Sequence, residues 1–434
     1  MPNDFSSPAV SPETDTKRGS IDSFVSPSTP IRRLPDSWNI WEQSLSQAIR
    51  QSLKYGSSQG ISDGERSESG NWRRSVVQLP VLSIEGLLDS VANMRRARLV
   101  LTMLLHFYVH TQPPSMDDVV HIPTSIAVLL HNISKAMGMP PVLTYSDNVL
   151  YNWSPVDLSS STPSADDELE CLTSFTSTPD ESHFNLTSAR IELRGNDALK
   201  VMKLLFPTQQ SATFPDPTTI SSALLQLSAI IQSMTSTLLD IRRGCDPTIF
   251  YTQIRPWLNG ASPKPWVFDG VEGPDRQPTK MAGSTAGQSP TIQCLDAFLG
   301  VEYLTHTADG QIPNPTIKSE NSVLTGMRSY MLPSHRTFIE EMIPRGQKLR
   351  SFIQCQSPSS GLVEAYNKAV TALKEFRDAH IRVVTLYIIN PSRSAAQAES
   401  VGTGKAPEKV MGTGGTELLP FLKGVRDRTK EGLL

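Results

Sequence analysis

His380 is the side chain with the clearest potential for metal chemistry. It lies in the segment 361–389, where apolar residues recur at spacings of three and four positions. This spacing predicts one buried face of a long helix, with His380 as its ionisable member. The charged residues of the segment, among them Arg377, fall outside this face. The face comprises Leu362, Tyr366, Ala369, Leu373, Phe376, His380, Val383 and Tyr387.

Two interpretations of His380 are open from the residues alone. A histidine on a buried helix face is commonly a core residue whose ring makes a hydrogen bond. A neutral imidazole can instead bind a metal or a haem iron. Zinc would need three or four donors, and no H-E-x-x-H motif or carboxylate cluster accompanies this histidine. A single helical histidine is the usual form of a proximal haem ligand.

Tyr251 and Arg255 form a second candidate site. They lie four positions apart in the predicted helix 247–258, so they should share a face. An aromatic ring beside a guanidinium group could hold a ligand that carries a flat ring and a carboxylate. The alternative is a surface arginine that stacks on an aromatic ring or pairs with an acid.

The segment 282–289 (AGSTAGQS) is a third candidate. Its small residues would let the backbone approach a ligand closely and point N–H groups at it. Ser289 followed by Pro290 is a strong signal for the start of a helix. The alternative is an ordinary flexible connector between helices.

Other familiar motifs are absent or incomplete. The sequence has no C-x-x-C, which excludes a zinc ribbon and a thioredoxin-like site. His106 and His110 lie four positions apart without a third donor near by, and we interpret them as structural. GTGK and GTGG fail as phosphate-binding loops because Glu399 and Glu417 stand where glycine is required.

Charge and composition limit the partners. The 40 Lys and Arg residues nearly balance the 43 Asp and Glu residues, giving a net charge of −3. Such a chain has no excess of positive charge that would attract nucleic acid or anionic lipid, so we expect neither partner. The N-terminus has no apolar core of a secretory signal, and the longest apolar run, 99–109, is too short to span a membrane. So few cysteines, four in all, fit the reducing cytoplasm. No long exposed apolar seam demands a partner, so we expect a monomer.

The element pattern predicts an all-α protein with two helical domains. Ser, Thr and Pro dominate residues 1–36, which predicts a disordered N-terminal extension. A small helical domain follows at 37–157, and a Ser-, Pro- and Asp-rich loop at 158–182 connects it to a large helical domain at 183–434. Within the large domain, 391–416 is predicted to be a mobile loop.

Helical periodicity defines the elements within these domains. A polar gap without periodicity is expected at 57–71, and strand patterns are scarce. The predicted helical segments are 38–49, 84–110, 184–206, 218–243, 247–258, 290–303, 333–341 and 361–389.

Taken together, these segments resemble the indoleamine 2,3-dioxygenase family, haem enzymes that open the indole ring of tryptophan. The resemblance runs from about Leu79 to the C-terminus, and its motifs occur in the same order as in the family. Each motif is weak alone, but five in order with compatible spacing are specific. The motifs are 140–153 (PPVLTYSDNVLYNW), 282–289 (AGSTAGQS), 330–336 (YMLPSHR), 377–380 (RDAH) and 412–416 (GTGGT).

The resemblance implies a role for each candidate residue. His380 would be the proximal ligand of haem b, and Arg255 would bind the substrate carboxylate. The remaining matches concern the walls of the pocket. They are the aromatic pair Phe250 and Tyr251, the distal aromatics Tyr145 and Phe184, the distal serine Ser188, the residues Ser284, Thr285 and Ala286 of the loop over the distal haem face, and Thr413 of the mobile GTGG loop.

The resemblance also implies the reaction. The family combines L-tryptophan with O₂ to give N-formyl-L-kynurenine, the first step of the kynurenine route to NAD, and a reductant not identified by the sequence must keep the iron ferrous. Three positions depart from the family pattern. Tyr251 replaces the usual Phe, Ser284-Thr285 replaces Gly-Ser, and Ala261 replaces Trp.

These departures keep two alternatives open. The first is a related haem dioxygenase or peroxygenase that acts on another indole and oxidises tryptophan weakly. The second is a non-catalytic haem sensor that keeps His380 but has lost the substrate site. Arg255 and the GTGG motif favour the enzyme.

Overall fold

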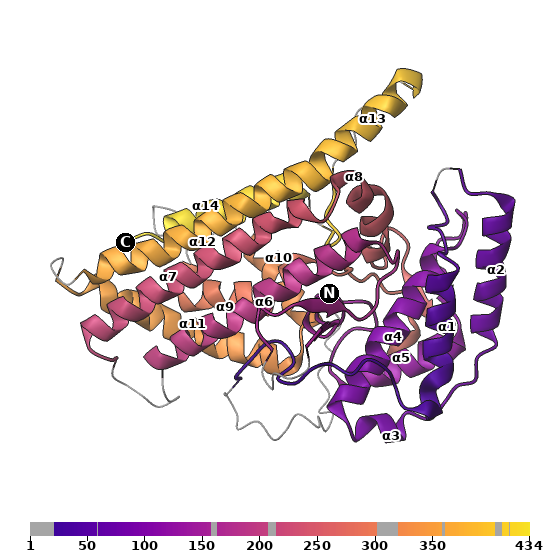
Figure 1. Ribbon diagram of the computed structural model, residues 1–434, viewed down its shortest axis with the longest axis horizontal. Helices are drawn as coiled ribbons and strands as arrows, with labels where there is room; N and C mark the ends of the chain where they lie inside the picture. Colours follow the sequence, from indigo (N-terminus) through magenta and orange to yellow (C-terminus); the bar gives the residue numbers. More distant parts are fainter. Residues whose placement is uncertain are drawn as a thin grey trace.

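Helices make up most of the protein, as the all-α prediction requires (Figure 1). The computed structural model describes residues 21–58, 60–157, 163–206, 214–301, 320–357, 361–403, 410–415 and 417–434. The α-helices are α1 (Asn39–Arg50), α2 (Asp63–Val77), α3 (Glu85–Leu88), α4 (Val91–His110), α5 (Thr124–Ala136), α6 (Pro179–Leu205), α7 (Pro217–Leu239), α8 (Pro247–Ile249), α9 (Pro290–Phe298), α10 (Glu320–Met327), α11 (Pro333–Gln354), α12 (Leu362–Val384), α13 (Asn390–Thr403) and α14 (Leu418–Glu431).

Short helical turns and two small sheets connect these helices. The 3-10 turns are η1 (Asp36–Trp38), η3 (Asp240–Arg243), η5 (Arg255–Leu258), η6 (Gly273–Arg276), η7 (Ala286–Gln288) and η9 (Arg328–Tyr330). The π-helical turns are η2 (Ser146–Leu150), η4 (Phe250–Ile254) and η11 (Thr385–Ile389). Strand β1 (Val120–Ile122) pairs in parallel with β4 (Trp266–Phe268), and β2 (Trp153–Pro155) pairs antiparallel with β3 (Leu169–Cys171).

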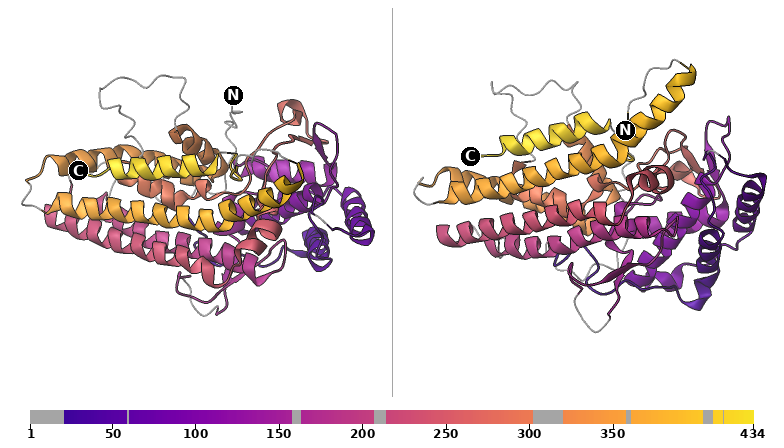
Figure 2. Two further views of the ribbon diagram at one scale, coloured as in Figure 1. Left: turned by 90° about the horizontal axis from the view of Figure 1, so that it is seen from above. Right: turned by 45° about the horizontal axis from the view of Figure 1, so that its top comes forward.

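A bundle of long helices forms the part of the molecule that contains His380. Helices α6, α7, α12 and α14 run alongside one another in both further views (Figure 2). The apolar face predicted for 361–389 is on α12 and η11, and its apolar members are buried. Helix α7 is long and apolar enough to span a membrane by composition, but Leu224, Leu227 and Ile231 are buried within the bundle.

The N-terminal helices pack beside one end of this bundle, around α4 (Figure 1). Arg98 of α4 is fully buried, and its Nε lies 2.9 Å from Asp147 Oδ1 at the start of η2. Arg98 also donates to the backbone oxygens of Pro140 and Val142, both at 2.8 Å. These buried charge-assisted bonds hold the segment that carries η2 against α4.

Two hydrophobic clusters lie inside the protein. One is built mainly from α1 to α5 and η2, and the other from the long helices of the bundle. The segment around η5 and β4 contributes Trp257, Trp266 and Phe268 to the first cluster, although it falls within the range predicted for the large domain. Parallel pairing of β4 with β1 explains this placement, because it ties the segment to the N-terminal helices.

Four segments differ from the predictions. Disorder is wrong for residues 21–36, where Phe24 and Leu34 are buried in the two clusters. The polar gap at 57–71 contains most of α2, which begins with a capping box between Ser62 and Glu65. The loop predicted at 158–182 includes β3 and the start of α6.

The mobile loop predicted at 391–416 is also wrong in part. Residues 390–403 form α13, which continues from η11 and extends away from the bundle (Figures 1 and 2). Beyond it, the structure describes the GTGG residues 412–415 as a turn. Several helices are longer or shorter than predicted, most clearly α11, which runs to Gln354 rather than to 341.

The pair His106 and His110 is structural, as predicted. Nδ1 of His106 is 2.8 Å from the backbone oxygen of Trp257, and Nε2 of His110 is 2.9 Å from that of Asn259. Both rings are buried on α4. They therefore hold the segment that directly follows Arg255.

We expect the stability of the apoprotein to fall in mild acid. Burial lowers the pKa of His106 to about 3 and that of His110 to about 4, from 6.5 in an unfolded chain. Between pH 6.5 and about 4 the unfolded chain therefore binds more protons than the folded one, so the free energy of unfolding decreases as the pH falls. Urea denaturation at pH 7 and pH 5 measures the effect, and His106→Asn should reduce the pH dependence. An unchanged pH dependence in this variant would show that buried His106 does not cause the loss of stability in acid.

Candidate active site

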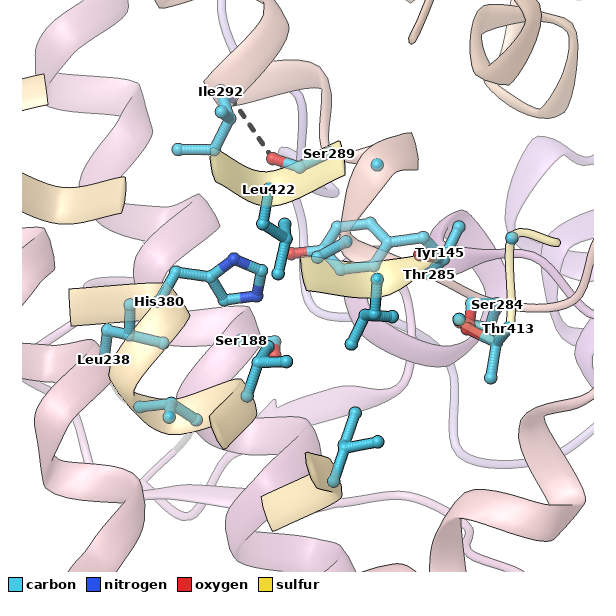
Figure 3. Close-up of a pocket in the computed structure, with 18 of the residues that line it drawn as sticks. Tyr145, Ser188, Leu238, Ser284, Thr285, Ser289, Ile292, His380, Thr413 and Leu422 are labelled. Atoms are coloured by element: carbon cyan, nitrogen blue, oxygen red, sulfur yellow. Dashed lines mark hydrogen bonds between the residues drawn. The ribbon is translucent and has the colours of Figure 1, made fainter. Parts of the chain in front are cut away.

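A mainly apolar cavity of about 280 Å³ lies between α6, α12, α14 and the loops around η2, η4 and η7. Nearly all of the predicted site residues line it, although they come from segments far apart in the sequence (Figure 3). The predicted residues that line the cavity are Tyr145, Phe184, Ser188, Phe250, Arg255, Ser284, Thr285, Ala286, His380 and Thr413.

His380 projects from α12 into this cavity, on the same side as Leu238 and Ser188 (Figure 3). Its ring nitrogens make no hydrogen bond with any residue that the structure describes, so the hydrogen-bonded core histidine is not what is found. Burial, and then the positive charge of Arg377, lower the pKa of His380 to about 4. The imidazole is therefore neutral at pH 7, the form that binds a metal.

A buried ion pair lies one turn before His380. Arg377 Nη2 is 2.6 Å from both carboxylate oxygens of Asp296 on α9, and Arg377 also donates to the hydroxyl of Thr429 on α14. The sequence pattern placed Arg377 outside the apolar face but did not predict its burial. The pair joins α9, α12 and α14 beside the cavity, which it also lines.

Removing this arginine should destabilise the apoprotein strongly. Arg377→Ala leaves the carboxylate of Asp296 buried without its partner, and we expect the free energy of unfolding to fall by about 3–5 kcal/mol. The matched control is Arg382→Ala on the exposed side of α12, for which we expect a change within about 0.5 kcal/mol. Urea denaturation measures both. Equal stability of the two variants would show that the pair is not stabilising α12.

Arg255 lines the cavity from the first position of η5, directly after the π-helical turn η4. One of its nitrogens, Nη2, donates to the backbone oxygen of Met411 at 2.6 Å, whereas its buried Nε has no partner among the described residues. Tyr251 stacks on the guanidinium with a distance of 5.7 Å from Arg255 Cζ to the ring centroid. The predicted shared face of Tyr251 and Arg255 is confirmed. Of the predicted aromatic pair, Phe250 lines the cavity as expected, but the prediction that Tyr251 also lines it is wrong.

The segment 282–289 and the GTGG residues 412–415 meet beside Arg255. The backbone N–H of Gly283 donates to the oxygen of Thr413 at 3.2 Å, and the Thr413 hydroxyl donates to the oxygen of Ser284 at 2.9 Å. Ser284 and Thr413 accordingly lie together in Figure 3, with His380 across the view from them. A Cβ on Gly283 would approach the oxygen of Leu258 to 1.9 Å, so only glycine permits this contact with η5.

Aromatic side chains form another wall of the cavity, and a buried carboxyl group lies behind it. The rings of Phe184 and Phe250 pack with centroids 4.8 Å apart. The hydroxyl of Tyr145 donates to Glu192 Oε1 at 3.0 Å, and Ser289 and Thr291 also donate to this carboxyl group. Burial raises the pKa of Glu192, which is fully inaccessible.

Comparison with known proteins connects this geometry to a family. A sequence model described as indoleamine 2,3-dioxygenase matches residues 19–432, nearly the whole chain. The chain belongs to the indoleamine 2,3-dioxygenase family. Members of this family are haem-dependent dioxygenases, so the protein is an oxidoreductase that uses haem and O₂ to act on an indole.

Curated members of the family are similar over most of their length. Indoleamine 2,3-dioxygenase 2 of Homo sapiens is 33% identical over 363 residues, covering 83% of this chain and 84% of the relative. Indoleamine 2,3-dioxygenase of Saccharomyces cerevisiae is 32% identical over 387 residues and 83% of each chain. The 6-hydroxytryptophan 2,3-dioxygenase of Fusarium equiseti is 29% identical over 428 residues, covering 94% of this chain and 95% of the relative.

The cavity fits the haem that indoleamine 2,3-dioxygenases require. His380 offers a neutral imidazole whose nitrogens no described residue uses, and it points into a mainly apolar space. Among the described residues, no cluster of three metal-binding side chains provides an alternative centre. These observations support His380 as the haem ligand.

Sequence reasoning missed two groups at this site. Glu192 lies four residues after Ser188, one turn along α6, and that spacing could have placed it near the cavity. Asp296 and Arg377 are 81 positions apart, and no local pattern connects them. Their pairing depends on how α9 packs against α12.

Proposed function

We propose that the protein opens the indole ring of L-tryptophan with O₂ to give N-formyl-L-kynurenine, with haem b held by His380. The observation that carries this proposal is the placement of Arg255 and Thr413 on one cavity with His380. A haem ligand, a carboxylate-binding cation and an aromatic wall are the three features that such a reaction needs in one place.

Arg255 would bind the carboxylate of the substrate. Its guanidinium is anchored through Nη2 to Met411, while Nε is buried and free to donate. A substrate carboxylate that accepts a hydrogen bond from Nε would form a charge-assisted contact worth about 1.5–3 kcal/mol. The backbone contacts between Gly283 and Thr413 would keep the two loops closed over the bound amino acid.

The aromatic wall would hold the indole ring and exclude water. Phe184, Phe250 and Tyr145 supply this wall, and Ser188 is a small polar group within it. Haem supplies the chemistry of dioxygen when it is bound. Both oxygen atoms enter the product, so no acid is needed to release water, and among the described cavity residues His380 is the sole histidine.

The substrate is tested directly with purified, haem-loaded protein and a chemical reductant. We expect L-tryptophan to be converted to N-formyl-L-kynurenine much faster than tryptamine, which lacks the carboxylate. Equal turnover of both would favour the alternative of a related haem enzyme acting on another indole. Haem binding without turnover of any indole would favour a non-catalytic haem sensor.

A ring-hydroxylated tryptophan is the second candidate substrate. One relative is named a 6-hydroxytryptophan 2,3-dioxygenase, and the loop residues Ser284 and Thr285 make this part of the cavity more polar than a glycine would. Such a substrate keeps both the carboxylate and the indole ring, so the roles proposed for Arg255 and His380 would be the same.

A further inference from the structure

A carboxamide side chain, Asn148, lies in the cavity wall formed by η2. It is 3% exposed, and its Nδ2 donates to Asn185 Oδ1 at 3.0 Å. Gln293 is another carboxamide in the wall, but Nε2 donates to Gly287 and Leu324 and Oε1 accepts from Arg328. Asn148 differs because no described residue donates to its Oδ1.

A chain of hydrogen bonds fixes which end of this carboxamide is free. It begins at the backbone N–H of Thr173, which donates to Asn152 Oδ1 at 3.1 Å. Nδ2 of Asn152 must therefore be the donor to Cys171 Sγ, at 3.5 Å, and to the oxygen of Thr173. Burial raises the pKa of Cys171 to about 12, so its thiol stays protonated and donates to the same oxygen.

The same chain continues to the cavity. Asn185 Nδ2 donates to Cys171 Sγ at 3.8 Å, which leaves Asn185 Oδ1 as an acceptor. Asn148 must then donate through Nδ2, and its carbonyl oxygen is the atom left for a ligand. The backbone donor of Thr173 fixes Asn152, and the N–H···S contact to the Cys171 thiol assigns Asn185, so the network gives each amide one orientation.

The segment that carries Asn148 is also held firmly. The neighbouring carboxylate of Asp147 pairs with buried Arg98 and accepts from the N–H and hydroxyl of Thr144. Asn148 is therefore a preorganised acceptor in a mainly apolar wall. A ligand that covered this carbonyl oxygen without offering a donor would bury it unpaired, which is unfavourable.

We propose that Asn148 determines substrate specificity by accepting a hydrogen bond from a hydroxyl group on the benzo ring of the indole. This inference rests on the proposed function. Arg255 takes the carboxylate, and the carbons that react with O₂ lie toward His380, so the benzo edge is the part of the substrate left for the η2 wall. The substrate class that fits is a ring-hydroxylated tryptophan.

The test compares wild-type protein with Asn148→Leu, which keeps the size but removes the acceptor. Equilibrium dialysis gives Kd, and steady-state kinetics give kcat/KM, for L-tryptophan and each benzo-ring hydroxy isomer. We expect at least one isomer to bind the wild type about tenfold more tightly than tryptophan, and the variant to lose this preference. Methoxy analogues, which lack the donor, should show no preference in either protein.

A second variant tests the hydrogen-bond chain. Asn185 does not line the cavity, so Asn185→Leu should leave the Kd for tryptophan unchanged but weaken the preference for the hydroxy isomer, because Asn148 can then rotate. If Asn148→Leu does not fold, Asn148→Ala serves instead. Wild type without preference for any isomer, or a preference that survives the loss of Asn148, would overturn the inference. Failure to bind or convert any indole amino acid would instead overturn the proposed function.

Discussion

His380→Ala protein should purify without haem. The neutral imidazole of His380 projects into the cavity without a bond to any residue that the structure describes, so its removal would leave the iron without a proximal ligand. We expect the haem content to fall from about one per chain to nearly none, since the remaining contacts are mainly apolar. The Soret absorption band and a haem extraction assay measure this loss.

The fold should survive the substitution, because His380 faces a cavity and makes no hydrogen bond with the described residues. The helical circular dichroism signal should therefore stay close to that of the wild-type apoprotein. His121→Ala is the matched control, since this exposed histidine pairs with Asp269 away from the cavity and should leave haem binding intact. Full haem occupancy in His380→Ala would show that the ligand assignment is wrong.

Arg255→Ala should lower kcat/KM for L-tryptophan by about tenfold to a hundredfold, the effect of losing a charge-assisted contact of about 1.5–3 kcal/mol. The reason is geometric: one edge of the guanidinium is anchored to Met411, and the buried Nε remains for the substrate. For tryptamine, which has no carboxylate, we expect little change. Steady-state kinetics on both substrates separate the two contributions.

Two further variants sharpen this comparison. Arg255→Lys keeps the charge but not the planar fork, and it should recover part of the loss. Arg276→Ala removes an exposed arginine from η6 and should have no effect. Equal losses for tryptophan and tryptamine in Arg255→Ala would mean that this arginine does not bind the carboxylate.

Local sequence patterns predicted the elements that carry the site. The spacing along 361–389 gave α12 and the direction of His380, because a helix places residues three and four apart on one face. Ser289 and Pro290 start α9 as expected, with the serine hydroxyl accepting from the N–H of Ile292. In both cases neighbouring residues alone determine the structure.

Patterns failed where distant residues decide the conformation. The resemblance placed both Phe250 and Tyr251 on the cavity, but within the π-helical turn Phe250–Ile254, Phe250 lines it, whereas Tyr251 does not and instead lies against Arg255. Residues 21–36 look disordered in isolation, yet Phe24 packs against His335 of α11. The capping box of α2 can be read from the sequence, but the helix was not predicted because its segment contains few apolar residues.

The buried polar groups could not be predicted for the same reason. Glu192 accepts from Tyr145, which precedes η2, and from Ser289 and Thr291 at the start of α9, so its donors come from two distant segments. Asn148 depends on Asn185 and on the chain beyond it. Such networks exist only after the helices have packed, so no spacing rule reveals them.

The most direct test of the central claim follows the oxygen atoms. Haem-loaded protein is supplied with ¹⁸O₂ and L-tryptophan, and the product is analysed by mass spectrometry before it can exchange with water. The cavity of Arg255, His380 and Thr413 predicts N-formyl-L-kynurenine that contains two labelled oxygen atoms. A product with one labelled atom, or no labelled product in the presence of bound ferrous haem, would contradict the assignment of this protein as a tryptophan dioxygenase.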